Sequence, residues 1–264
     1  MYRLSPYCAP EFAPLVSGTW NVPPALAAVL PPPSDPWSIS PQLGTLLFRL
    51  VTEYSASHVL EFGAGSSSVV LAAALAEHGG GQLTSIEEDP RWCAKCWEQV
   101  GHAARVDAEL VGARPKLTWG LPGPYYAYRD AGTRIAARGP YDLIPIDAPQ
   151  YYYGRDGALH IAHEQMAVGA LIVLDDAGRS SERWSVRRWL RTYRGLELRL
   201  YDPSFGGKGV AILEVTTLLE PHFDAVTIAS GAYYALEYWS KRRKRRRRRA
   251  KAEKQATTNM HEAK

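Results

Sequence analysis

Residues 59–68 read Val-Leu-Glu-Phe-Gly-Ala-Gly-Ser-Ser-Ser, and this stretch decides the fold. An apolar run leads into Glu61, then come Gly63 and Gly65, and an apolar stretch over 69–75 follows the serines. This order predicts a buried strand, a tight glycine turn and the start of a helix. The serine side chains can cap the free N–H groups at the beginning of that helix.

The glycine turn is typical of a site that binds a nucleotide cofactor. Gly63 and Gly65 have no Cβ, so the backbone can turn sharply and lie close to a ligand, with Ser66 beside it. Glu61 would repel a pyrophosphate but suits a cationic ligand such as S-adenosylmethionine, which carries an ammonium and a sulfonium. The alternative is a glycine-rich turn that binds nothing.

A second acidic residue follows at the expected distance. Residues 82–88 predict a second strand that ends in Glu87, and a carboxylate there can accept hydrogen bonds from both ribose hydroxyls of an adenosine cofactor. Glu88 should point the other way if the strand continues. A solvated strand end is the alternative for Glu87.

These segments resemble motif I and the acidic second-strand motif of the class I S-adenosylmethionine-dependent methyltransferases. Tyr-Asp-Leu-Ile-Pro-Ile-Asp-Ala-Pro at 141–149 is similar to the fourth-strand motif of that family, and residues 170–177 resemble its fifth strand with the terminal acids. The resemblance spans about residues 40–216. Two departures stand out: Ala148 replaces a common glycine, and Pro145, which has no N–H to donate, lies inside a central strand.

The alternation of helical and strand patterns predicts an α/β fold, a Rossmann-like doubly wound sheet that is mostly parallel. Strands over 196–202 and 208–216 are joined by a loop too short for a crossover helix, so they should form a C-terminal antiparallel hairpin. The pattern also predicts a long loop over 112–139 and a helix from Asp156 to about Val168.

Ligands of open α/β sheets bind at the carboxyl ends of the strands, which places Asp147, Asp175 and Asp176 near the glycine turn. We expect Asp147 to contact the cofactor and to act in catalysis. The three carboxylates could also bind Mg²⁺, which would make an acceptor hydroxyl more acidic. The resemblance to catechol-type O-methyltransferases is incomplete, because they have Asp-Asn where this chain has Asp-Asp. Asp147 could contact only the cofactor or acceptor, and Asp176 could cap a turn.

Two further groups are candidates for the acceptor side. His160 lies just inside the helix expected after the fourth strand and could serve as a catalytic base, although a hydrogen-bonded helix residue is the commoner role. The aromatic run from Tyr151 to Tyr153 could line an acceptor pocket, or it could pack on the edge of the sheet.

The chain divides into a Pro-rich N-terminal arm (1–36), a cofactor-binding domain (37–216) and a C-terminal extension (217–264). Residues 241–249 are all Lys or Arg, whereas the chain before them carries more acidic than basic residues. Such a run repels itself, so we expect a disordered tail that could hold nucleic acid or an anionic surface without sequence preference. A solvated tail without a partner is the alternative.

Composition narrows the class of protein. The 264 residues are 46% hydrophobic, with no apolar run long enough to span a membrane and no secretory pattern at the start. Three cysteines provide no disulfide framework, and Cys93 with Cys96 are more plausibly two small helix residues than a redox or zinc site. We therefore expect a cytoplasmic protein with a small-molecule acceptor; the oligomeric state stays open.

The expected function is transfer of a methyl group from S-adenosylmethionine to a hydroxyl of a small molecule. An NAD-type oxidoreductase on a related fold is one alternative. A module tethered to nucleic acid by its basic tail, with a vestigial pocket, is the other.

Overall fold

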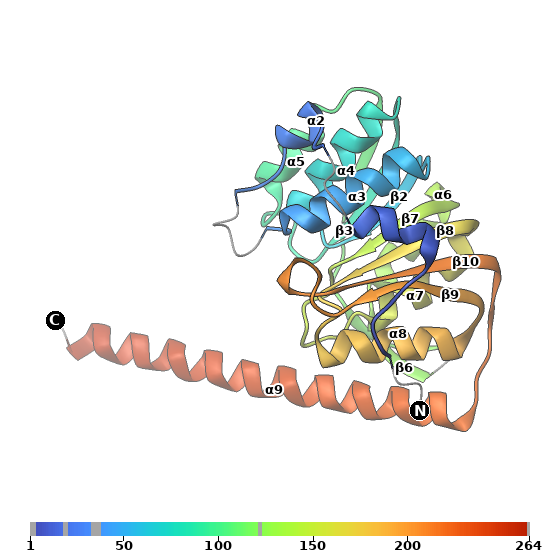
Figure 1. Cartoon of the computed structure of the whole chain (residues 1–264). Coiled ribbons are helices and arrows are strands. Elements are labelled where there is room, and N and C mark those ends of the chain that lie inside the picture. Colours follow the sequence, from blue (N-terminus) through green and yellow to red (C-terminus); the bar gives the residue numbers. More distant parts are fainter. Residues whose placement is uncertain (1–3, 18–20, 33–37, 121–122, 263–264) are drawn as a thin grey trace.

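The computed structural model describes residues 4–17, 21–32, 38–120 and 123–262. Figure 1 shows a central sheet with helices on both faces and one long helix that runs out beyond the body. The strands are β1 (Tyr7–Cys8), β2 (His58–Phe62), β3 (Gly81–Glu87), β4 (Val106–Gly112), β5 (Lys116–Gly120), β6 (Gly123–Ala127), β7 (Tyr141–Ile146), β8 (Met166–Asp175), β9 (Tyr193–Asp202) and β10 (Val210–Pro221). The α-helices are α1 (Ala13–Val16), α2 (Pro24–Ala27), α3 (Pro41–Glu53), α4 (Ser66–Glu77), α5 (Ala94–Val100), α6 (Gly132–Arg138), α7 (Asp156–Ala162), α8 (Ser180–Thr192) and α9 (Ala225–Glu262).

The main sheet has the strand order β1-β9-β10-β8-β7-β2-β3-β4. Strands β8, β7, β2, β3 and β4 are parallel, whereas β10 lies antiparallel between β8 and β9. The structure therefore confirms the predicted Rossmann-like fold with a C-terminal antiparallel hairpin. Part of the N-terminal arm joins the sheet as well, because Tyr7 and Cys8 pair with Tyr201 and Leu200 at its edge.

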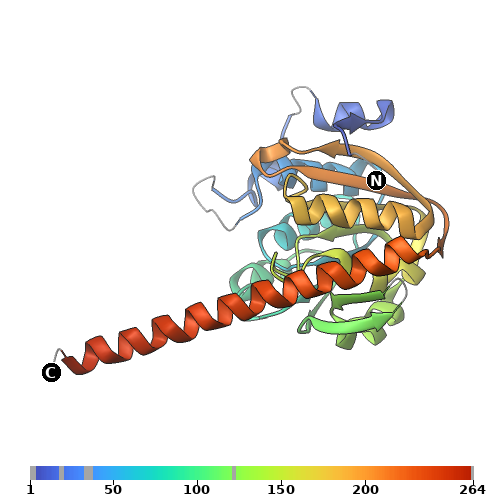
Figure 2. The same ribbon diagram turned by 90° about the horizontal axis from the view of Figure 1, so that it is seen from below.

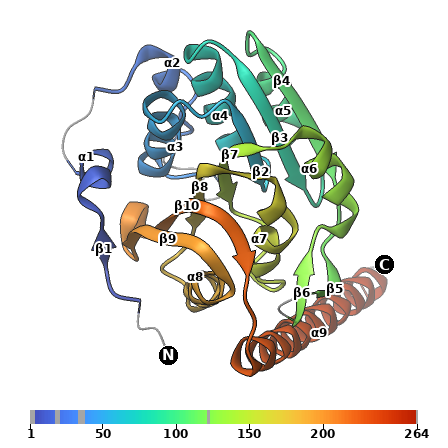
Figure 3. The same cartoon turned by 90° about the vertical axis from the view of Figure 1, so that its right-hand side faces the viewer.

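Alternate residues of each central strand face two separate cores. Val59 of β2 and Leu143 of β7 pack with α3 and α4, while Leu60 and Ile144 pack on the other face with α7 and α8. Figure 3 shows the two layers of helices on opposite sides of the sheet. This alternation follows from the two-residue repeat of a strand, and burial on both faces explains the nearly continuous apolar sequence of these strands.

Two local features match the sequence pattern. The Ser40 hydroxyl accepts a hydrogen bond from the Leu43 N–H at 3.1 Å, so it caps α3 as the Ser-Pro pair predicts. Pro145 lies in β7 opposite Val173 of β8, while β7 is registered with β2 only at Leu143 and Ile146. A proline therefore sits in a central strand because the ladder toward β2 is interrupted at its position.

The prediction of a loop over 112–139 is wrong. This segment contains the antiparallel hairpin of β5 and β6 and then the short helix α6. Glycine and proline flank these elements and hid them, yet Tyr126 and Tyr128 are almost completely buried, and Ile135 anchors α6 in the core. Side chains of the hairpin are buried inside the protein, whereas those of a polar connecting loop would face the solvent.

The prediction of a helix from Asp156 to Val168 is wrong at its C-terminal end. Helix α7 stops at Ala162, a short 3₁₀ turn follows, and β8 begins at Met166. Gly169 has a φ of 90°, and the register between β7 and β8 shifts near the start of β8. Strand β8 therefore begins before the segment at 170–177 that resembles the fifth strand, and its irregular first residues gave no strand pattern in the sequence.

The C-terminal segment differs from the expected disordered tail, because it forms the long helix α9. Figures 1 and 2 show α9 lying along the hairpin of β5 and β6 before it extends away from the body. The ring of Tyr234 packs against that of Trp184 at a centroid distance of 3.7 Å, which ties the first half of the helix to α8. Lys and Arg are good helix formers, so a helix anchored in this way can continue through the basic run. No helix in the described part of the chain is long and apolar enough to cross a membrane.

Candidate active site

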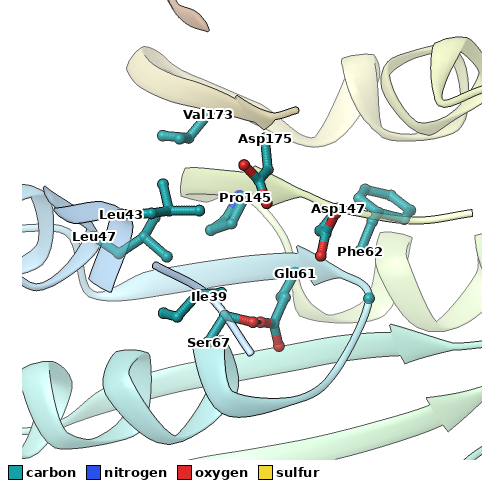
Figure 4. A pocket seen from close by; sticks show the side chains of 11 residues that line it. Ile39, Leu43, Leu47, Glu61, Phe62, Ser67, Pro145, Asp147, Val173 and Asp175 are labelled. Atoms are coloured by element: carbon teal, nitrogen blue, oxygen red, sulfur yellow. Dashed lines mark hydrogen bonds between the residues drawn. The ribbon is translucent and has the colours of Figure 1, made fainter. Parts of the chain in front are cut away.

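The carboxyl ends of the parallel strands β2, β7 and β8 meet around a small cavity, with the end of β3 beside β2. The Asp147 N–H donates to the Phe62 carbonyl at 2.8 Å, and the Gly63 N–H donates to the Ile86 carbonyl at 2.9 Å. These bonds hold the ends of β2, β3 and β7 together. Figure 4 shows the cavity that they border. Its lining consists of Ile39, Leu43, Leu47, Glu61, Phe62, Gly63, Ser67, Pro145, Asp147, Val173 and Asp175.

The two glycines of the turn have different surroundings. Gly63 has a φ of 103°, and a Cβ there would lie 3.0 Å from the Ala148 Cβ and 3.2 Å from its nitrogen. Gly65 is extended, and a Cβ there would meet no atom within 4 Å. The first glycine is therefore required by the fold itself, whereas the second borders open space that a ligand can fill.

Glu61 is the acid at the centre of the turn. Its carboxylate accepts hydrogen bonds from the hydroxyls of Ser67 at 2.5 Å, Ser68 at 2.6 Å and Ser85 at 2.6 Å. Burial nevertheless raises the pKa of Glu61 to about 7, and the nearby Asp147 adds to this effect. Both oxygens already have donors, so Glu61 fixes the turn to β3 and contributes charge to the cavity that it lines.

The raised pKa of Glu61 predicts a specific dependence of stability on pH. The unfolded chain loses this proton near pH 4.5 and the folded chain near 7, so stability should fall as pH rises between these values. Glu61→Gln cannot titrate and should remove on the order of 3 kcal/mol of this pH-dependent loss. Urea unfolding of both proteins from pH 4 to 8 measures the difference, and parallel curves would contradict the assigned pKa.

Glu87 lies beside the glycine turn, as predicted. It ends β3 partly buried, and its carboxylate accepts the Asp89 N–H at 2.9 Å and also lies near the Ala64 N–H. Burial raises its pKa. The Ser66 hydroxyl instead accepts the Ile39 N–H at 3.0 Å, so this predicted cofactor residue ties α4 to the segment before α3.

Asp147, Asp175 and Asp176 come together as predicted, with one oxygen from each lying within 4.8 Å of the others. Burial, with the charges of Asp147 and Asp176, raises the pKa of Asp175 to about 7. The guanidinium of Arg155 lies among these acids. It donates to Asp147 at 2.5 Å, to Asp176 at 2.9 Å and to the Asp175 carbonyl at 2.8 Å.

This arrangement already contains a positive charge where a divalent cation would bind. The buried guanidinium binds one oxygen of Asp147 and one of Asp176. Burial alone would lower the pKa of Arg155, but Asp147, Glu182 and the other acids outweigh it and raise that pKa above its usual range. Arg155 therefore stays charged, and its guanidinium lies between the acids that the expected Mg²⁺ would bind.

His160 is not brought to this cavity. Its ring is buried inside the protein, with one nitrogen 2.7 Å from the Tyr193 hydroxyl and the other 3.2 Å from Asp156. Asp156 also forms an ion pair with Arg188. Burial lowers the pKa of His160. The histidine thus belongs to a polar network that joins α7, α8 and β9, and it does not line the cavity.

The tyrosine run lies under α9 and is absent from the cavity lining. Arg245 stacks over Tyr152 at 4.4 Å, and Arg242 stacks over Tyr153 at 4.8 Å and over Tyr126 at 4.0 Å. These contacts favour the packing role that the sequence left open for residues 151–153. They also place the basic end of α9 next to the loop that follows Asp147.

Three solved structures that this chain resembles in fold are methyltransferases. One of Podospora anserina, bound to S-adenosylhomocysteine (SAH), has a TM-score of 0.54 at 15% identity over 82% of this chain and 100% of that one. An O-methyltransferase of Streptomyces achromogenes, involved in tomaymycin synthesis and complexed with S-adenosylmethionine, scores 0.51 at 21% identity over 78% and 95%. An O-methyltransferase of Bacillus cereus in complex with SAH scores 0.51 at 19% identity over 78% and 95%. At these identities the likeness shows the fold alone, and no curated protein matches the chain.

Residues 60–177 match the family described as a methyltransferase domain. The chain contains a methyltransferase domain. The matched segment begins in β2 at the glycine turn and ends just after Asp176, so it includes every acid around the cavity. This match favours a methyltransferase over the oxidoreductase that the sequence left as an alternative.

Sequence reasoning missed two residues of the methyltransferase domain. Ser85 could have been found, because it precedes Glu87 by two positions on β3 and lies opposite Glu61 in the parallel register. Arg155 had no such signal. A single arginine in a Gly-Arg-Asp sequence is indistinguishable from a solvated loop residue until the fold places it among the acids.

Proposed function

We propose that this methyltransferase domain uses S-adenosylmethionine and transfers its methyl group to a hydroxyl oxygen of a small molecule. Gly63, Gly65 and Ser66 would form the turn against which the cofactor lies. Glu61 would supply negative charge, and Glu87 would accept the ribose hydroxyls. When bound, S-adenosylmethionine supplies an activated methyl group on sulfur.

One observation carries the proposal: the titratable residues that line the cavity are Glu61, Asp147 and Asp175, and all three are acids. Such a lining favours a cationic ligand and disfavours a pyrophosphate. Two of these acids have a pKa near 7, so a neighbouring cation would promote their ionisation. Binding of the cofactor should therefore release protons near neutral pH.

The residues of the chain would contribute positioning and proton removal. Asp147 keeps 46% of its side chain exposed at the cavity, while one of its oxygens is held by Arg155. An acceptor hydroxyl could donate its proton to this carboxylate while its oxygen forms the new bond to the methyl carbon and the carbon–sulfur bond breaks. Alignment of the reacting atoms matters more for this displacement than strong acid–base chemistry.

The proposed reaction is tested by incubating the full chain with S-adenosylmethionine and a panel of phenols, catechols and aliphatic alcohols. Formation of SAH together with a methylated product that requires a hydroxyl would support the proposal. Methylation of amines or thiols alone would still support methyltransferase activity, but it would contradict oxygen as the acceptor atom. The O-methyltransferases with this fold support the oxygen acceptor.

We further propose that the basic end of α9 holds polyanions by charge. Residues 243–248 are exposed, and the tail carries most of the positive excess of the chain. Replacing Lys244, Arg246 and Arg247 with glutamine should weaken binding of duplex DNA, chosen as the polyanion probe. It should also lower the slope of log affinity against log salt by about 3. Fluorescence anisotropy at several salt concentrations measures this slope.

The matched control neutralises three exposed arginines of the body, Arg105, Arg129 and Arg134. This variant should bind the probe like the wild type. Equal losses of DNA affinity in both variants would show that net charge alone causes the effect. That result would contradict a specific role for α9.

A further inference from the structure

The positive charge among the acids of the cavity comes from the chain itself. We propose that Arg155 takes the position that a divalent cation would hold between Asp147, Asp175 and Asp176, so that methyl transfer runs without a bound metal. This inference rests on the proposed function. It makes Arg155 a positioning residue, because its guanidinium touches the acids that would face the acceptor and not the acceptor itself.

The contacts of Arg155 are those of a bridging cation. Its Nη2 group binds an oxygen of Asp147 at 2.5 Å and one of Asp176 at 2.9 Å, and its Nη1 group binds the main-chain carbonyl of Asp175 at 2.8 Å. One group thus joins the end of β7 to the end of β8. Charge-assisted bonds of this kind are stronger than neutral hydrogen bonds and fix geometry well.

The backbone around Arg155 is held on both sides. Gly154 has a φ of 76°, and a Cβ there would lie 2.3 Å from the ring of Tyr238 in α9. A Cβ on Gly157 would lie 2.1 Å from the Tyr126 carbonyl of β6. Both glycines are therefore needed for close packing, and the side chain between them is 4% exposed. The position of the guanidinium follows from the fold and does not depend on a flexible surface side chain.

Electrostatics opposes a second cation in the same place. A divalent ion beside the guanidinium would be repelled by it, because like charges at close range in a partly buried site interact strongly. Arg179 adds further positive charge, with a nitrogen 2.7 Å from Asp176. Arg155 pairs with Asp147 and Asp176, and Arg179 also pairs with Asp176, so a metal would have to compete with these cations for the acids.

Removing the guanidinium should convert this cluster into a metal site. Mn²⁺ is the probe, followed by electron paramagnetic resonance on protein first treated with a chelator. The wild type should show no saturable Mn²⁺ binding up to millimolar concentrations. Arg155→Met should gain one site, which should be lost again when Asp147→Asn is added. Arg155→Lys keeps the charge and should exclude Mn²⁺ like the wild type.

Two results would contradict the proposal. A wild-type Mn²⁺ site that Asp147→Asn abolishes would overturn the proposal, as would a folded Arg155→Met variant that gains no site. If Arg155→Met does not fold, the wild type and Asp147→Asn decide the question alone. These titrations need no cofactor, so failure of this inference is distinguishable from failure of SAH binding.

Discussion

Asp147→Asn should lower kcat for methyl transfer by about 10²–10⁴-fold, the usual contribution of a positioned general base. The amide keeps the size of the side chain and can still accept a hydrogen bond from Arg155, but it cannot take a proton from an acceptor hydroxyl. The affinity for SAH should change much less than kcat. Initial rates of SAH formation and calorimetric titration of SAH separate the two effects.

A control shows whether loss of one carboxylate matters only at the cavity. Asp130 pairs with Lys116 in an exposed position, so Asp130→Asn should leave both rate and affinity unchanged. If the Asp147→Asn variant kept the wild-type rate, the carboxylate would take no part in the reaction. Alignment by the cavity would then have to account for the whole rate.

Gly65→Ala should weaken SAH binding about 10-fold or more while the fold keeps its stability. A Cβ at this position meets no protein atom within 4 Å, and the extended backbone tolerates a side chain, so the methyl group would occupy only the space assigned to the cofactor. A tenfold loss corresponds to about 1.4 kcal/mol. Calorimetry with SAH and thermal unfolding of the free protein measure the two properties.

Gly63→Ala is the matched comparison and should behave in the opposite way. With a φ of 103° and a Cβ only 3.0 Å from that of Ala148, it should destabilise the fold by about 1–3 kcal/mol. Equal losses of stability in the two variants would contradict the open space at Gly65. An equal loss of SAH affinity in the Gly63→Ala and Gly65→Ala variants would contradict the distinct roles of the two glycines.

The main features of the fold could be predicted because each depends on local sequence. The apolar run into Glu61 and the glycine turn indicate β2 and the start of α4, and the short link between the last two long strands requires an antiparallel hairpin. Acids at strand ends meet wherever parallel strands share an edge, which explains the correct grouping of Glu61, Asp147 and Asp175.

The missed features depend on contacts between distant segments. His160 has a sequence position compatible with catalysis, but packing of α7 against α8 and β9 turns its ring toward Asp156 and Tyr193. Arg155 reaches the acids only because the glycines on either side let α7 approach β6 and α9. Neither outcome is encoded in a pattern along the chain, since both arise from tertiary packing.

The central claim is that the cavity beside Gly63 and Gly65 binds S-adenosylmethionine. Calorimetric titration of the full chain with SAH, and with NADH under the same conditions, tests it most directly. The account predicts saturable binding of one SAH per chain and no binding of NADH. Binding of NADH without binding of SAH would contradict it.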